Sequence, residues 1–359
     1  MRLSDILSLR AKPAEGLSMG LTRRCPLHCA HCSTSSTMDS EQLPSHCYTR
    51  FVDTFTRESH PTLLALSGGE ALLRPRLVEQ LALAAKQVGT YTSVLSGMFF
   101  AQGGHIPKPI ARALAAVDHF SASIDQFHEL EVPRESVFAV LSILLDDGKN
   151  LSIHIAGTHA DDPYIDDIVH AIQRCFGQRI PMVVNTLSRF GRGRELIPQS
   201  PWVPWDGTPE PCTVAAWPVI TFNGDVVACG NDNLSGQVPE HLLLGHIQDS
   251  NWSDIANACR KRHTLRALRT VGPQWLAKRY QHLRKQVPVF TEQSAAACQA
   301  CITLADHGEL DQQVGRWMDN MQHVNLEQEI IELQTQLGAS AFAKRYTHPR
   351  YADLVMLGQ

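Results

Sequence analysis

The most informative stretch of this sequence is Gly16-Leu-Ser-Met-Gly-Leu-Thr-Arg-Arg-Cys25-Pro-Leu-His-Cys29-Ala-His-Cys32. The small and apolar residues at the start of this stretch predict a short strand. The strand leads into three cysteines with the spacing C-x3-C-x2-C. Thiolates are the usual ligands of iron–sulfur clusters, so three of them can hold three irons of a [4Fe–4S] cluster and leave the fourth iron without a protein ligand. A cysteine zinc site normally closes its tetrahedron and fits this loop less well. Unrelated or disulfide-forming cysteines are the other alternative.

This cysteine spacing resembles the signature of the radical S-adenosylmethionine (SAM) enzymes. The resemblance implies that Cys25, Cys29 and Cys32 are the catalytic residues that hold a [4Fe–4S] cluster. It also implies that the amino and carboxylate groups of SAM chelate the fourth iron. His31 occupies the position where the family's backbone lies against adenine. We therefore expect two cofactors at this loop, the cluster and SAM.

Length, charge and cysteine content set the frame. The chain has 359 residues, enough for one large domain with a smaller one or for a single α/β barrel with additions. A net charge of −4 gives no strong basic field, so we expect neither nucleic acid nor a membrane as a partner. Charged residues interrupt Met1–Arg10, where a signal peptide needs an apolar run, and no apolar stretch is long enough to span a bilayer. We expect a cytoplasmic protein whose ten cysteines bind metal rather than form disulfides.

A second motif follows the next predicted strand. The run Thr62-Leu-Leu-Ala-Leu-Ser67 is typical of a buried strand in a parallel sheet, and it ends in Gly68-Gly69-Glu70. Two glycines allow a sharp turn and a close approach to a ligand, and Glu70 adds an anionic acceptor. Taken alone, the motif also fits a plain Gly-Gly turn before a helix. In the radical SAM family such a stretch contacts the methionine amino group of SAM, so the resemblance implies that Gly68, Gly69 and Glu70 bind SAM.

The rest of the N-terminal half alternates predicted strands and helices. The apolar patterns predict strands over 90–96, 119–125, 151–156 and 182–187 and helices over 77–86, 108–117, 134–147 and 164–175. Such alternation implies βαβ units and a parallel sheet with right-handed crossovers. Six units fit into this half of the chain, too few for a closed eight-unit barrel. The fold class is therefore α/β, and the count and order resemble the partial (β/α)6 barrel of the radical SAM family.

Functional residues in such sheets lie at the carboxyl ends of the strands. The candidate SAM-binding residues at these ends are Ser96, Ser123, Asp125 and Leu187, the last within the segment Asn185–Arg189, and Arg134 is a further candidate downstream of the fourth strand. The segment from Ser123 to Arg134 resembles the family's fourth-strand motif, in which a serine and a downstream arginine bind the ribose and carboxylate of SAM. A helix-capping pair is the alternative for Ser123 and Asp125, and a solvated charge is the alternative for Arg134. Residues 188–194 resemble the family's Gly-Arg-Ala-like turn, whose arginines here meet either substrate or solvent.

The C-terminal third contains a second set of cysteines. A proline-rich stretch over 197–211 suits a linker. Cys212 and Cys229 then flank a predicted β-hairpin with a type I′ turn at Asn223-Gly224, which brings its two ends together. Cys298 and Cys301 follow after a long gap in a C-x2-C pair. Four cysteines can ligate a [4Fe–4S] cluster completely.

This arrangement resembles the twitch domain of radical SAM enzymes, a shortened SPASM domain with one auxiliary [4Fe–4S] cluster. The resemblance implies that Cys212, Cys229, Cys298 and Cys301 hold that cluster. A four-cysteine zinc site is the alternative, because the ligands alone do not name the metal. Cys259 is expected to be an ordinary buried cysteine, like Cys47 and Cys175, or to replace one of the four ligands.

We divide the chain into a radical SAM partial barrel over 1–196, a small α+β twitch-like domain over 197–305 and a helical extension over 306–359. The apolar stripe of the extension is typical of core packing or a dimer seam. The domain resemblance implies a radical SAM oxidoreductase or maturase. In that interpretation, SAM is cleaved reductively, the resulting 5′-deoxyadenosyl radical abstracts a substrate hydrogen atom, and the second cluster accepts or relays an electron.

The expected substrate is a ribosomally synthesised peptide, and the alternative is a small-molecule alcohol or aminosugar. An external electron donor of the flavodoxin or ferredoxin type is expected. Few residues precede the first strand, so a leader-peptide-binding module would be a separate protein. Asp232 is either a proton acceptor on the substrate side or part of a capped turn. A non-catalytic iron–sulfur or zinc scaffold also explains the cysteines, but it gives no reason for Glu70, Ser123 and Arg134 to follow successive strands.

Overall fold

The computed structural model describes residues 1–187, 189–197, 205–230, 238–283, 297–304 and 307–358. Its centre is a nine-stranded sheet with the order β6-β5-β4-β3-β2-β1-β7-β8-β9. Strands β1 to β6 pair in parallel and in sequence order, as the βαβ pattern predicts. The strands are β1 (Gly16–Gly20), β2 (Leu63–Ser67), β3 (Tyr91–Ser96), β4 (His119–Ile124), β5 (Asn150–Gly157), β6 (Met182–Thr186), β7 (Val219–Ile220), β8 (Asp225–Val227) and β9 (Leu243–His246).

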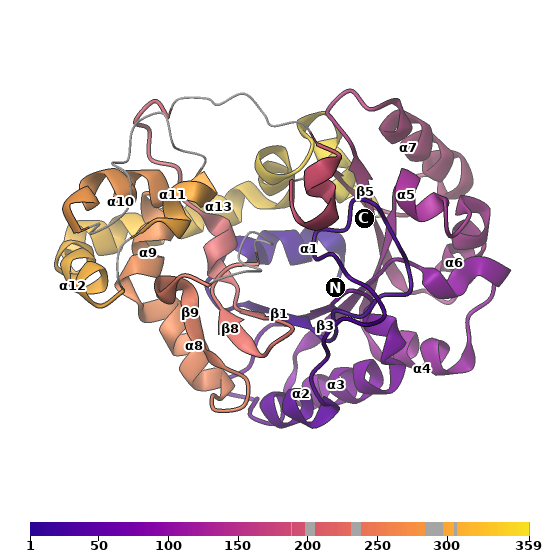
Figure 1. Cartoon of the computed structure of the whole chain (residues 1–359), viewed down its shortest axis with the longest axis horizontal. Coiled ribbons are helices and arrows are strands. Elements are labelled where there is room, and N and C mark those ends of the chain that lie inside the picture. The colour runs from indigo at the N-terminus through magenta and orange to yellow at the C-terminus, as the bar shows by residue number, and fades with distance from the viewer. Residues whose placement is uncertain (188, 198–204, 231–237, 284–296, 305–306, 359) are drawn as a thin grey trace.

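Helices cover the outer side of the curved sheet, whereas α8 to α12 form a separate group beside β9 (Figure 1). The helices of the first half are α1 (Leu3–Ser8), α2 (Ser45–Val52), α3 (Pro75–Val88), α4 (Lys108–Ala116), α5 (Gln126–Glu129), α6 (Arg134–Asp146) and α7 (Pro163–Phe176). Those of the second half are α8 (Trp252–Lys261), α9 (His263–Thr270), α10 (Pro273–Arg279), α11 (Ala297–Ile302), α12 (His307–Met318) and α13 (Met321–Tyr346). No helix in these described ranges has both the length and the apolar character needed to cross a lipid bilayer.

The two faces of the sheet differ in side-chain size. Outward positions such as Leu66, Phe120 and Ile153 are buried in the main core beneath the helices. Several inward positions carry small polar residues, and the β4–β5 register places Ser121 opposite Ser152. Because side chains alternate between faces along a strand, one apolar face anchors the helices while part of the concave face is small and polar. The α/β partial-barrel prediction is confirmed in this arrangement.

The predicted hairpin after the linker forms, but with a different turn. Strands β7 and β8 pair antiparallel, and β7 also pairs in parallel with β1, so the hairpin extends the barrel's sheet. A type I′ turn needs a positive φ at both central residues, whereas Gly224 has a φ of 97° and Asn223 does not take a positive φ. The Asn223 side chain instead accepts a hydrogen bond from the Asp225 backbone and bonds to Thr221. The type I′ prediction was wrong, because Gly224, the last residue of the loop, is left-handed and Asn223 before it is not.

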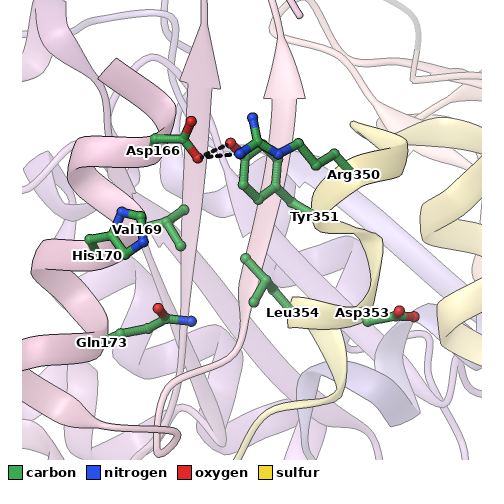
Figure 2. A pocket seen from close by; sticks show the side chains of 8 residues that line it. All are labelled: Asp166, Val169, His170, Gln173, Arg350, Tyr351, Asp353 and Leu354. Atoms are coloured by element: carbon green, nitrogen blue, oxygen red, sulfur yellow. Dashed lines mark hydrogen bonds and ion pairs between the residues drawn. The ribbon is translucent and has the colours of Figure 1, made fainter. Parts of the chain in front are cut away.

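The C-terminal extension packs on the barrel rather than standing apart from it. Helix α13 contacts α1, and the 3-10 helix η9 (Pro349–Met356) contacts β6. The His348 backbone N–H donates to the Val184 carbonyl of β6 at 2.7 Å. Figure 2 shows Asp166 of α7 facing η9, where its carboxylate accepts from the Tyr351 hydroxyl at 2.5 Å and pairs with Arg350 at 3.1 Å. The extension therefore covers the edge strand, which would otherwise be open to pairing with another chain.

Candidate functional site

The Gly-Gly-Glu turn packs directly on the segment that leads into the cysteine loop. Gly69 donates its backbone N–H to the Thr22 carbonyl at 2.7 Å, and Glu70 donates to the Arg24 carbonyl at 2.9 Å. A Cβ on Gly68 would lie 2.5 Å from the Thr22 carbonyl oxygen, and one on Gly69 would lie 2.5 Å from that of Arg23. The glycines are thus required for close approach to the chain itself, and this contact brings Glu70 next to the cysteines.

The three predicted cluster cysteines converge in one loop, and none of them forms a disulfide. Cys25 and Cys29 are buried, and Cys32 is half-buried. Burial and the neighbouring charges of Glu70, Cys29 and Cys32 raise the pKa of the Cys25 thiol to about 12. Burial opposes ionisation of Cys32 as well, but hydrogen bonds from Thr34 at 3.5 Å and from the Ser36 backbone at 3.3 Å lower its pKa. Three thiolates this close repel one another unless a positively charged group lies between them, which fits an iron–sulfur core.

Glu70 is a buried carboxylate with three hydrogen-bond donors around it. It accepts from the Leu72 backbone at 2.9 Å, the Ser96 hydroxyl at 3.0 Å and the Gly97 backbone at 2.9 Å. Burial raises its pKa to about 7, although these hydrogen bonds oppose the rise. In the part of the chain that the structure describes, no lysine or arginine pairs with this carboxylate. A cationic amino group on a bound molecule would complement it, so the residue fits the predicted role, and Ser96 orients it.

Asp125 holds two histidines beside the cysteine loop. One carboxylate oxygen caps α5 by accepting from the backbones of Phe127 and His128. The other binds His128 Nδ1 at 2.5 Å and His31 Nε2 at 3.1 Å. Burial disfavours the carboxylate, but the two histidines hold the pKa of Asp125 well below its usual range. The capping alternative is therefore observed, and Asp125 in addition fixes the ring that precedes Cys32.

The structure leaves one ring nitrogen of His31 ready for a ligand. Its Nδ1 is buried and has no hydrogen-bond partner among the described residues, while its ring stacks on Phe127 with centroids 4.9 Å apart. An orphaned buried nitrogen at this place fits a site that closes around a bound molecule. His128 was missed by the sequence analysis, because only the fold brings it to the loop.

The other predicted SAM-binding residues lie in three different settings. Ser123 is on the concave face of β4, level with His154 of β5. Leu187 extends β6 by donating its N–H to the Gly157 carbonyl at 2.8 Å. The Arg134 guanidinium pairs with Glu129 at 2.8 Å and Asp167 at 2.7 Å. Glu129 and Asp167 thus bind the guanidinium N–H groups that a SAM carboxylate would need. This arrangement favours the surface-charge alternative for Arg134.

The second cysteine set comes from three separate elements. Cys212 precedes the 3-10 helix η5 (Thr213–Ala216), Cys229 follows β8, and Cys298 and Cys301 lie on α11. Burial raises the pKa of the Cys301 thiol well above its usual value, and the charges of the other three thiols add to the rise. The sulfurs of Cys212, Cys229 and Cys298 therefore all lie within electrostatic reach of Cys301. The His241 Nε2 atom is 3.4 Å from the Cys301 sulfur.

The remaining cysteines are placed only partly as expected. Cys259 is fully buried and donates to the Ala216 carbonyl at 3.3 Å, which fits a core residue. Cys47 is buried, whereas Cys175 is exposed on α7, contrary to its expected burial. Cys175 lies in the last turn of α7 and is exposed there, although the residues one turn earlier, 171 and 172, are buried. Asp232 lies outside the described residues.

Comparison with known proteins shows which proteins the chain resembles. No family model matches the chain. PqqA peptide cyclase of Methylorubrum populi is 35% identical over 112 residues, which are 30% of this chain and 28% of that protein. The crystal structure of Streptococcus suis SuiB bound to precursor peptide SuiA has a TM-score of 0.50 and 14% identity over 73% of this chain and 68% of its own. Native anSMEcpe with bound AdoMet and a peptide gives a TM-score of 0.49 and 12% identity over 88% and 99%.

The matched stretch spans less than a third of the cyclase's length, and the likeness to SuiB concerns the fold. Both agree with what the cysteine loop, the Gly-Gly-Glu turn and the order of the strands predict. The chain therefore resembles the radical SAM enzymes in sequence and shares their fold.

Proposed function

We propose that the chain is a radical SAM enzyme that modifies a ribosomally made peptide by oxidation. The observation that carries this proposal is the meeting of three thiols, the Glu70 carboxylate and the Asp125–His31 pair at the carboxyl ends of neighbouring parallel strands. A peptide substrate is supported by the two relatives whose names include a peptide, PqqA peptide cyclase and SuiB with its precursor peptide.

The protein's own contribution is binding, orientation and exclusion of water. Cys25, Cys29 and Cys32 would hold the cluster, and the buried Glu70 would accept hydrogen bonds from the amino group of SAM. When bound, the cluster supplies the electron that splits SAM into methionine and a 5′-deoxyadenosyl radical, which takes a hydrogen atom from the substrate. Asp125 keeps His31 in place against this site.

The second cysteine set would hold an auxiliary cluster. With Cys212, Cys229, Cys298 and Cys301 all acting as ligands, no iron remains for substrate, so an electron acceptor or relay is the role that fits. The first electron would come from a separate flavodoxin- or ferredoxin-type donor in the cytoplasm. A separate protein would bind the leader part of the peptide.

The test is product formation by anaerobically reconstituted, reduced protein. With SAM, the wild-type protein is expected to form 5′-deoxyadenosine, and the Cys29→Ala variant is expected to form none. Cys175→Ala, which changes an exposed cysteine, serves as the matched control and keeps activity. Absence of 5′-deoxyadenosine from a wild-type protein that holds iron would end the enzyme proposal and leave a scaffold.

A further inference from the structure

The turn after the last parallel strand reaches back to the cysteine loop. It is the 3-10 helix η4 (Gly191–Glu195), and Arg192 carries its main contacts. The Arg192 guanidinium donates from Nε and Nη2 to the Cys29 carbonyl at 3.0 and 2.8 Å, and from Nη1 to the Ser36 carbonyl at 2.9 Å. Its backbone N–H donates to the Cys32 carbonyl at 3.0 Å. One residue thus binds the loop at three places.

The backbone before Arg192 is fitted just as closely. Gly191 has a φ of 50°, and a Cβ there would lie 2.3 Å from the carbonyl oxygens of Cys32 and Ser33. No other residue fits that space, since the obstructing atoms are backbone atoms. This contact joins the loop after β6 to the loop after β1, so it connects the two outer strands of the set β1 to β6.

The charge of Arg192 has no counter-ion in the described part of the chain. Its hydrogen bonds go to carbonyl oxygens, and none of the ion pairs of the described residues includes it. An arginine side chain stays charged at every pH that a protein tolerates. A half-buried guanidinium of this kind is stable when an anionic group lies near it, and the anionic groups of this loop are its three thiols.

We propose that Arg192 is a positioning residue for the candidate cluster: its fork fixes the loop backbone at Cys29 and Ser36, and its positive charge favours the reduced, more negative state of the cluster. The inference rests on the proposed function, and the reducing electron comes from the external donor, for which dithionite stands in the assay. The arginines of this turn were predicted to meet substrate or solvent, whereas Arg192 contacts the cysteine loop.

The first test uses cluster-free protein and therefore does not depend on the proposed activity. Hydrogen–deuterium exchange is measured for the amides of residues 25–36 in Arg192→Gln and Arg192→Lys. Both variants lose the paired guanidinium hydrogen bonds to the Cys29 and Ser36 carbonyls. The exchange rate of these amides is therefore expected to be at least roughly fivefold higher than in wild type. Arg194→Gln changes an exposed arginine of the same turn and is expected to leave exchange unchanged. Wild-type exchange in both Arg192 variants would overturn the proposal.

The second test separates the charge from the fork. Reconstituted proteins that also carry Cys301→Ala, so that only the first cluster contributes, are titrated with dithionite and followed by electron paramagnetic resonance. At the wild-type midpoint potential, the reduced fraction is expected to fall from one half to roughly one tenth in Arg192→Gln and to stay near one half in Arg192→Lys. An unchanged midpoint in Arg192→Gln would overturn the charge role. A wild-type protein that assembles no cluster would instead contradict the proposed function.

Discussion

The two cysteine sets of this chain are assembled in opposite ways. Cys25, Cys29 and Cys32 lie in one loop after β1. The loops after β2 and β6 hold that loop through backbone hydrogen bonds, and the loop after β4 holds it through the Asp125 side chain, which binds His31. The second set draws its members from η5, the end of β8 and α11, and only the fold brings them together. The first set provides three sulfurs beside an anionic residue and two histidines, whereas the second provides four sulfurs with one histidine nearby.

This difference indicates that the two sites have different roles in the proposed reaction. A site with three ligands keeps one coordination position for a small molecule, and the polar groups around it are oriented toward that molecule. A site with four ligands is closed and suited to electron transfer.

The largest effects are expected when one cysteine of each set is removed. Wild-type protein should bind about eight irons, and Cys29→Ala or Cys301→Ala should each bind about four. Only Cys29→Ala should lose the capacity to cleave SAM, since only the first set leaves a position for it. Iron analysis together with chromatography of 5′-deoxyadenosine measures both results. Loss of SAM cleavage in Cys301→Ala with an intact first cluster would break the contrast.

A smaller effect is expected from the carboxylate beside the first set. Glu70→Gln removes the negative charge that complements the amino group of SAM, so SAM affinity should fall roughly 10- to 100-fold. Equilibrium dialysis of the reconstituted protein with labelled SAM gives the dissociation constant. Asp206→Asn, which changes an exposed acid far along the chain, should leave it unchanged. Equal SAM affinity in Glu70→Gln and wild type would remove Glu70 from the site.

The same residue should leave a signature in the pH dependence of stability. Burial raises the pKa of Glu70 to about 7 in the folded protein, above its ordinary value of 4.5. A raised pKa means that the folded chain binds the proton more tightly, so stability from this group is greatest below pH 4.5 and is lost as pH rises to 7. The loss amounts to about 3 kcal/mol. Urea unfolding of cluster-free protein should show that Glu70→Gln gains stability relative to wild type across this window, and a constant difference would contradict the burial argument.

Adding a single methyl group tests the backbone contact that joins the Gly-Gly-Glu turn to the segment before the cysteine loop. Gly69→Ala places a Cβ 2.5 Å from the Arg23 carbonyl oxygen and should cost about 2 kcal/mol of stability. Gly308→Ala is the control, because a Cβ at this exposed position of α12 meets nothing within 4 Å and alanine favours a helix. Thermal unfolding compares the two variants. A Gly69→Ala protein as stable as wild type would mean that the loops are not tightly joined.

The smallest effect is expected at Arg134, where sequence and structure point in different directions. Its ion pairs with Glu129 and Asp167 are partly exposed, so Arg134→Gln should cost no more than about 1 kcal/mol of stability. SAM affinity should change less than about twofold, because the arginine contacts acids rather than the ligand. A large loss of SAM affinity would restore the family-derived role of this residue.

The sequence predicted what is local and missed what depends on distant parts of the chain. Each parallel strand is a short apolar run and each helix an amphipathic one, so the units from β2 to β6 were placed within a few residues. The cysteine loop and Glu70 carry their chemistry in consecutive residues. The contacts of Arg192 with the cysteine loop, of His128 with Cys29 and of His241 with Cys301 required the fold, because these partners lie far apart in the sequence. The turn at Asn223 was missed because local side-chain hydrogen bonds favoured another geometry.

The central claim is that the first cysteine set leaves one position open for SAM. It is tested most directly by the electron paramagnetic resonance spectrum of reduced Cys301→Ala protein, in which only the first cluster remains, recorded before and after SAM is added. The account predicts that SAM shifts the signal of this cluster and that Glu70→Gln requires more SAM for the same shift. A spectrum that does not change with SAM would show the position to be closed and would contradict the account.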